Sequence, residues 1–185
     1  VRIIGMGGSS LGAQAIYGFF KDKIKKKFDF VDNLQPNPIS EEKKFLNIII
    51  SKSGNTTETI VNANIIIKKN DKNIFITEKK NSYLYNLAEK LKSDIIHHNN
   101  YIGGRYSVLS EVGMLPAELM GLNSEKFKNL NSLVKNKKFI NALVLSVNSI
   151  LQLSKQKKYN SVIINYDQKS ENFFKWYQQL VSESL

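Results

Sequence analysis

Cysteine is missing from the sequence, and proline and tryptophan are scarce, with three and one among 185 residues. A chain without cysteine has neither disulfide bonds nor thiolate-ligated metals. This composition is compatible with the reducing cytosol, so we expect a cytoplasmic protein. Long apolar runs are missing as well. The most apolar long window, residues 139–153, is too short to span a bilayer and contains four Asn or Ser side chains, so no membrane segment is predicted.

Arginine is nearly absent. Only Arg2 and Arg105 are arginine, so lysine supplies 25 of the 27 basic residues behind the formal net charge of +11. Recognition of phosphates and bases favours the forked guanidinium, and here the lysines are scattered among many Asn and Ile residues. The lysine runs at residues 21–27 and 135–138 are typical of solvated helix faces. A charge of this size would ordinarily suggest a nucleic-acid or membrane partner. Because arginine is scarce and the lysines are scattered, we predict neither partner.

The sequence begins inside a strand-like run, residues 1–4, and stops at residue 185 without a turn or capping signal. This pattern is typical of a piece cut from a longer protein at both ends. We expect such a piece to be inactive, or nearly so, on its own. For the same reason, the absence of a targeting segment carries little weight.

The most informative stretch is residues 48–59 (IIISKSGNTTET), where an apolar run stops at a cluster of hydroxyl groups, one glycine and one acid. A buried strand that leads through such a loop into a helix presents free backbone N–H groups to an anion, and the helix dipole favours negative charge there. Because the GxxxxGK[ST] pattern of nucleotide-binding loops is absent, we expect a small phosphomonoester. The alternative is an ordinary helix cap by Asn55 with Glu58 reaching back, and the two interpretations are compatible.

Strand-like and helix-like patterns alternate along the first two thirds of the chain. Strands are predicted at residues 1–4, 28–31, 45–50, 73–77 and 94–97, and helices at 13–20, 41–44, 56–69 and 83–92. The alternation predicts an α/β fold with a doubly wound, mostly parallel sheet. Ligands of such sheets bind beyond the carboxyl ends of the strands, where residues 5–12 (GMGGSSLG) and the 51–59 loop both lie.

The glycines of residues 5–12 leave alternatives open. Their spacing superficially resembles a dinucleotide-binding fingerprint, but the acidic residue expected about 20 residues later, at a strand end, is poorly placed. Tight packing of a helix on a strand accounts for the glycines but not for Ser9 and Ser10.

The pattern changes at residue 122. Helices are predicted at 124–134, 138–156 and 170–185, with one strand at 159–165. We therefore divide the chain into a first domain, residues 1–122, and a second part, residues 123–185. The second part is predicted to be a helical connection and the start of a second α/β domain.

Two charged side chains stand out by their position. Arg105 follows two glycines, and its permanently charged guanidinium could stabilise an oxyanion; a salt bridge to a helix end is equally compatible. Glu183 lies four residues after Gln179, so both project from one side of the last predicted helix, although a solvated glutamate is the simpler alternative. His97 and His98 have no further ligands at metal-binding spacing, so no metal site is predicted.

Together these motifs resemble the glucose-6-phosphate isomerase family, whose core consists of flavodoxin-like sugar isomerase (SIS) domains. The resemblance covers essentially the whole chain, in the family's order. It rests on residues 5–12, the 51–59 loop (SKSGNTTET), residues 103–107 (GGRYS), residues 166–167 (YD) and residues 179–184 (QLVSES). The phosphate loop occurs across SIS proteins, whereas GGRYS followed by QLxxES is much more specific to this family.

The resemblance implies an aldose–ketose isomerase of glycolysis and gluconeogenesis that interconverts glucose 6-phosphate and fructose 6-phosphate without a metal or organic cofactor. Glu183 would move a proton between C1 and C2, and Arg105 would stabilise the cis-enediolate between them. The other implied residues bind the hexose 6-phosphate: its phosphate would contact Ser51, Lys52, Ser53, Thr56 and Thr59, and its sugar would contact Gly8, Ser9, Gly104 and Gln179. We expect the intact enzyme to be a homodimer.

The sequence also departs from the family. The family's ring-opening histidine and a later lysine would lie beyond residue 185, and His97 and His98 do not occupy the histidine position. Residues 30–37 (FVDNLQPN) depart from the Asn/Asp-rich turn that the family has there. Two alternatives stay open: a SIS domain that senses a sugar phosphate and regulates transcription, and a dual-specificity phosphoglucose/phosphomannose isomerase.

Overall fold

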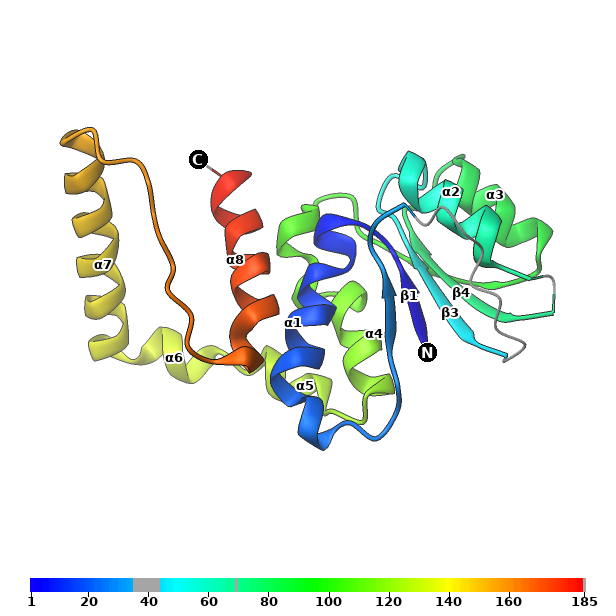
Figure 1. Cartoon of the computed structure of the whole chain (residues 1–185), viewed down its shortest axis with the longest axis horizontal. Helices are drawn as coiled ribbons and strands as arrows, with labels where there is room; N and C mark the ends of the chain where they lie inside the picture. Colours follow the sequence, from blue (N-terminus) through cyan, green and yellow to red (C-terminus); the bar gives the residue numbers. More distant parts are fainter. Residues whose placement is uncertain (35–43, 69, 185) are drawn as a thin grey trace.

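The computed structural model describes residues 1–34, 44–68 and 70–184, and a parallel β-sheet forms its centre. The five strands of this described part are β1 (Arg2–Ile4), β2 (Asp29–Val31), β3 (Leu46–Ile50), β4 (Lys72–Thr77) and β5 (Asp94–His97). They lie in the order β2-β1-β3-β4-β5, and every neighbouring pair is parallel (Figure 1). This is the flavodoxin-like order of a doubly wound sheet, so the predicted fold class is confirmed.

Helices cover both faces of the sheet. On one face lie α1 (Leu11–Phe20) and α4 (Glu111–Leu119), and on the other lie α2 (Thr57–Ile66) and α3 (Tyr83–Lys90) (Figure 1). Successive strand residues point to opposite faces, so Ile3 packs in the core under α1 and α4, whereas Ile4 packs in the core under α2 and α3. Because both faces are buried, a central strand needs consecutive apolar residues, which explains the unbroken run at residues 48–50.

The elements predicted for the first 122 residues agree with the structure to within a few residues. Helix α1 begins at Leu11 rather than at residue 13, and α2 ends at Ile66 rather than at residue 69. The side chain of Ser82 caps α3 by accepting a hydrogen bond from the N–H of Tyr85 (3.4 Å). The short helix predicted at 41–44 lies outside the described residues except for Lys44, which precedes β3 without helical structure.

The last third of the described chain contains the helices α5 (Ser124–Lys128), α6 (Asn131–Lys135), α7 (Lys137–Lys155) and α8 (Glu171–Ser182). Helix α8 packs against α1, whereas α7 contacts α6 and stands apart from the sheet (Figure 1). The prediction of one helix at 124–134 is wrong: the backbone leaves helical geometry at Asn129 (φ −80°, ψ 69°), and two short helices form instead. The division of the chain at residue 122 stays a prediction.

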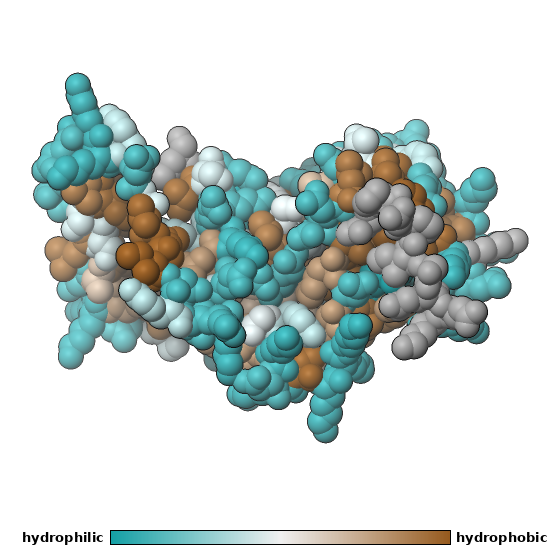
Figure 2. Space-filling model, viewed as in Figure 1, coloured by the Kyte–Doolittle hydropathy of each residue, from teal (hydrophilic) through white to brown (hydrophobic). Residues whose placement is uncertain are grey.

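Residues 159–165, which the sequence predicts to be a strand, form an irregular segment. A β-strand needs a neighbouring strand to satisfy its N–H and C=O groups, and none of the described strands pairs with this segment, so the prediction is wrong. Its apolar side chains and many of those along α7 are exposed, and Figure 2 shows apolar surface at this end of the molecule. Within the described residues, no helix combines the length and the apolar character that crossing a bilayer requires.

Candidate active site

One open cavity lies beyond the carboxyl ends of β1 and β3, between which the winding direction of the sheet reverses. Five segments of the chain line this cavity, with the residues Met6, Gly7, Gly8, Ser9, Lys52, Ser53, Thr56, Glu58, Glu78, Lys80, Gly104, Arg105, Gln179 and Glu183. Nine of the eleven residues that the sequence nominates are among them, and Ser51 and Thr59 are not. The fold therefore brings the nominated segments to one place, although they are far apart in the sequence.

The loop between β3 and α2 has the form of an anion cradle. Gly54 adopts a left-handed backbone conformation (φ +67°), and its N–H donates to Ser51 Oγ (3.2 Å), so the loop folds back over the end of β3. Thr56 is the N-cap residue of α2, but its hydroxyl contacts Ser51 Oγ (2.9 Å) instead of capping the helix. The first N–H groups of α2 are therefore available to a ligand, which is the arrangement that a phosphate site requires.

Three polar side chains near this loop differ from expectation. The alternative that Asn55 caps α2 is wrong, because Asn55 Oδ1 accepts the N–H of Tyr83 (2.9 Å) at the start of α3. Ser51 and Thr59 are each 1% exposed, so their side chains lie inside the protein rather than on the cavity surface. Among the described residues Thr59 Oγ1 has no hydrogen-bond partner, and a buried hydroxyl without a partner costs free energy.

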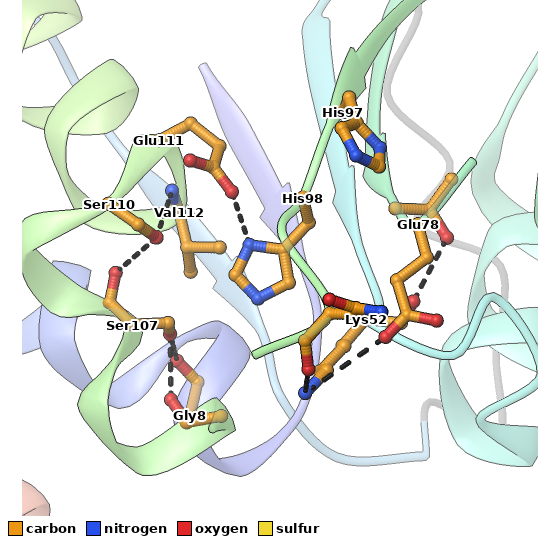
Figure 3. Close-up of polar contacts among 12 residues, drawn as sticks. Gly8, Lys52, Glu78, His97, His98, Ser107, Ser110, Glu111 and Val112 are labelled. Carbon is orange, nitrogen blue, oxygen red and sulfur yellow. Dashed lines mark hydrogen bonds and ion pairs between the residues drawn. The ribbon is translucent and has the colours of Figure 1, made fainter. Parts of the chain in front are cut away.

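The loop after β1 lies directly against the loop that carries Arg105. Ser107 Oγ donates to the carbonyl oxygens of Gly8 (3.2 Å) and Gly104 (2.7 Å), which ties the two loops together (Figure 3). A Cβ atom at Gly8 would lie 2.2 Å from the carbonyl carbon and oxygen of Gly104. Only glycine fits at this position, because the opposing atoms belong to the backbone.

We expect Gly8→Ala to lower the free energy of unfolding by about 1–3 kcal/mol, the usual cost of overpacking. The new methyl group would push the Gly104 backbone away from the loop after β1. Gly104→Ala is the matched control, because a Cβ atom there would meet nothing within 4 Å. The measurement is urea unfolding of both variants followed by circular dichroism. Equal stability of the two variants would contradict the close approach of the two loops.

Arg105 is held at the cavity by contacts from several sides. Its Nε donates to Ser184 Oγ (2.9 Å), its guanidinium lies over the ring of Tyr106 (4.7 Å to the centroid), and Trp176 Nε1 donates to its backbone oxygen (3.1 Å). Its NH1 lies 3.6 Å from Glu183 Oε2. The salt bridge to a helix end, one of the two interpretations of Arg105 from the sequence, is therefore present. Its partner is Glu183, the proposed base.

Glu183 directly follows α8, which ends at Ser182 rather than continuing to residue 185. Gln179 Nε2 donates to Glu183 Oε1 (2.8 Å), so the two side chains project from the same side, as their spacing predicts. The other carboxylate oxygen faces Arg105. One oxygen is thus held by an amide and the other by a guanidinium, which fixes the direction of a carboxylate whose side chain is 46% exposed.

Hydrogen bonds shift two pKa values at the cavity. The hydrogen bond between Tyr106 OH and Ser184, followed in size by the interaction with Arg105, lowers the pKa of Tyr106 from its ordinary value of 10.0. The hydrogen bond from Lys80 lowers the pKa of Glu78 from its ordinary value of 4.5, so this side chain is a carboxylate at neutral pH.

Three charged residues of the cavity, Glu58, Glu78 and Lys80, are not among the residues nominated for the site. Glu58 belongs to the 51–59 loop but the sequence indicates only a helix-cap role for it, and Glu78 and Lys80 belong to no motif. Glu78 and Lys80 nevertheless follow the carboxyl end of β4, which pairs with β3. The rule that ligands bind beyond these strand ends would have indicated both of them.

The two histidines at the end of β5 have different partners. His97 Nδ1 accepts the N–H of Lys79 (3.1 Å). His98 is 1% exposed, and its Nδ1 contacts the carboxylate of Glu111 at the start of α4 (Figure 3). This contact joins the two ends of the segment that carries Arg105, so it closes that segment into a loop.

We expect His98→Leu to lower the free energy of unfolding by about 2 kcal/mol, because Glu111 would lose its partner. Breaking a fully buried pair costs about 3–5 kcal/mol, and the Glu111 side chain is 21% exposed, which lessens the loss. The double variant His98→Leu/Glu111→Leu is expected to lose less free energy of unfolding than the sum of the losses in the two single variants. Chemical unfolding of the three variants measures this coupling, and strictly additive losses would contradict it.

Comparison with known proteins decides the family. The sequence model of one family, described as phosphoglucose isomerase, matches residues 1–185. The chain belongs to the phosphoglucose isomerase family. The glucose-6-phosphate isomerase of Methanocaldococcus jannaschii is 33% identical over 204 residues, and that of Acholeplasma laidlawii is 35% identical over 216 residues. Both matches cover 100% of this chain but 50% and 49% of the relatives, so the chain spans about half the length of the curated relatives it matches.

Solved structures with a similar fold are also known. A hypothetical protein of Thermus thermophilus matches with a TM-score of 0.77 and 25% identity, over 100% of this chain and 48% of that protein. A putative phosphosugar isomerase of Bacillus subtilis matches with a TM-score of 0.57 and 22% identity, over 88% of this chain and 51% of that protein. The second likeness shows the fold alone.

Proposed function

We propose that the full-length protein is a glucose-6-phosphate isomerase, which interconverts glucose 6-phosphate and fructose 6-phosphate by proton transfer between C1 and C2. The observation that carries this proposal is the pair formed by Arg105 and Glu183, 3.6 Å apart, in the same cavity as the β3–α2 loop. An anion site and an acid–base pair at one cavity suit a substrate with a phosphate at one end and a carbonyl at the other.

Two features of the β3–α2 loop support the phosphate site. The N-terminus of α2 lacks a side-chain cap, so its N–H groups and dipole favour an anion. Lys52, Ser53 and Thr56 line the cavity and add further donors.

The proposed chemistry uses a base and a cation. Glu183 removes the proton from C2 of glucose 6-phosphate, and the electron pair moves through the new C1–C2 double bond onto the carbonyl oxygen at C1. The guanidinium of Arg105 stabilises this cis-enediolate. Glu183 then returns the proton to C1 as the hydroxyl proton of O2 passes to O1, which leaves the C2 ketone of fructose 6-phosphate. Gln179 holds the carboxylate in place through its hydrogen bond (2.8 Å). No electrons leave the sugar, so the overall reaction is an isomerisation.

The proposal includes a homodimer that acts in the cytoplasm. The lack of cysteine supports the reducing compartment. The exposed apolar side chains along α7 support association, because large apolar patches of soluble proteins are usually covered.

The test is an assay of the full-length protein with fructose 6-phosphate in deuterated water. We expect glucose 6-phosphate that carries deuterium at C2, since the proton on the base exchanges with solvent. A parallel assay with mannose 6-phosphate distinguishes a strict glucose enzyme from a dual-specificity isomerase. Binding of fructose 6-phosphate without conversion would overturn the proposal and favour a sensor.

A further inference from the structure

Two charged residues of the cavity form an ion pair that has no part in the proposed proton transfer. Glu78 and Lys80 follow β4, and Lys80 Nζ lies 2.6 Å from Glu78 Oε2. Lys52 Nζ lies 4.0 Å from the other oxygen, Oε1, and also donates to the carbonyl oxygen of Asn100 (2.6 Å). The Glu78 carboxylate therefore lies between two ammonium groups, and Figure 3 shows its link to Lys52.

The position of Glu78 is fixed by the phosphate loop. The N–H of Glu78 donates to the carbonyl oxygen of Lys52 (3.1 Å), and Thr77 Oγ1 donates to the same oxygen (3.4 Å). The Glu78 side chain is 12% exposed, whereas the Lys80 side chain is 48% exposed. Lys80 is thus the partner that can move, because its long side chain has room to turn while Glu78 stays in place.

The charges of the cavity balance in the absence of a ligand. Three cations and three carboxylates line it: Lys52, Lys80, Arg105, Glu58, Glu78 and Glu183. Arg105 and Glu183 pair with each other, so Lys52 and Lys80 are the cations left to face a phosphate group. A doubly charged phosphate that enters beside Glu58 and Glu78 would meet excess negative charge unless a lysine turned toward it.

We propose that Lys80 makes the site selective for doubly charged phosphate esters. On binding, its ammonium group moves its hydrogen bond from Glu78 to a phosphate oxygen, and Glu78 stays beside Lys52 at the phosphate loop. Lys80 is therefore a specificity residue of the substrate site. This inference rests on the proposed function, since it assumes that the ligand of the cavity is a sugar phosphate.

The test compares glucose 6-phosphate with glucose 6-sulfate, which has a similar shape but one negative charge. At pH 8 the phosphate ester is a dianion, because its second pKa is about 6. Binding to the full-length protein is measured by titration calorimetry. We expect Lys80→Met to weaken binding of the phosphate ester about 10-fold and binding of the sulfate ester less than about 2-fold, because the lost cation matters more to a dianion.

Lys79→Met is the matched control, since the side chain of Lys79 lines a separate cavity with His97 and Tyr85. This variant is expected to bind both esters as the unchanged protein does. Lys80→Arg keeps the charge and is expected to restore most of the preference for the phosphate ester, which separates loss of charge from loss of folding. Equal weakening of both esters by Lys80→Met, or no weakening, would overturn the inference.

The outcomes separate this inference from the proposed function. If the protein isomerises fructose 6-phosphate but Lys80→Met leaves the phosphate preference unchanged, the inference fails and the proposed function stands. If Lys80→Met removes the preference but the protein converts no hexose phosphate, the proposed function fails and the selectivity stands.

Discussion

Glu183→Gln is expected to lower kcat for fructose 6-phosphate by about 10²–10⁴-fold in the full-length protein, the usual contribution of a general base. The amide has the shape of the carboxylate but cannot accept the proton from carbon. KM is expected to change little, because the phosphate loop, which is remote from Glu183 in the sequence, supplies most of the proposed binding contacts. Exchange of deuterium into the sugar should fall by the same factor, since exchange and isomerisation share the first proton transfer.

Glu171→Gln is the control for this substitution. Glu171 lies in the first turn of the same helix, α8, and its side chain is 63% exposed and paired with Lys175. Its replacement removes the same charge without touching the cavity, so kcat should stay within about 2-fold of the unchanged value. Retention of full activity by Glu183→Gln would show that the base is a different residue.

Arg105→Met is expected to lower kcat by about 10²–10³-fold, the usual cost of removing one group that stabilises a developing oxyanion. Methionine keeps much of the length and the apolar stem but loses the charge. Arg105→Lys is expected to recover little activity, because the guanidinium donates through Nε to Ser184 while NH1 faces Glu183, and one ammonium group cannot occupy both positions.

Lys175→Met is the matched control for the lost charge. Lys175 lies on the exposed part of α8 and pairs with Glu171. We expect this variant to have the kcat of the unchanged protein in the same assay. If both lysine and methionine at position 105 supported normal turnover, the stabilising cation would have to be Lys52 or Lys80, the other cations among the described residues that line the cavity.

The parallel sheet could be predicted from the sequence because its strands are buried on both faces and leave a local signal. Residues 48–50 are three consecutive isoleucines bounded by Asn47 and Ser51, and β3 ends where this run ends. Residues 159–165 carry a similar signal, yet they form no strand among the described residues. A strand depends on a neighbour for its hydrogen bonds, and that dependence is invisible in the segment's own sequence.

The site could be predicted in part, because residues that follow parallel strands gather at one edge of the sheet. This argument places the Gly8 and Ser53 loops together, and both line the cavity. Asn55 shows the limit of local patterns. Its sequence position is typical of a helix cap, but its side-chain oxygen accepts a hydrogen bond from the N–H of Tyr83 instead. Lys80 shows another limit, since one lysine among many in a lysine-rich chain gives no signal until its neighbours in space are known.

The hydrogen bond from the indole of Trp176 to the backbone oxygen of Arg105 (3.1 Å) gives this chain a built-in optical probe. Trp176 is its single tryptophan. Indole emission responds to hydrogen bonding and to local polarity, so any displacement of the Arg105 backbone would change the wavelength or the intensity of that emission. Movement of this loop can therefore be followed by ultraviolet fluorescence without attaching a dye.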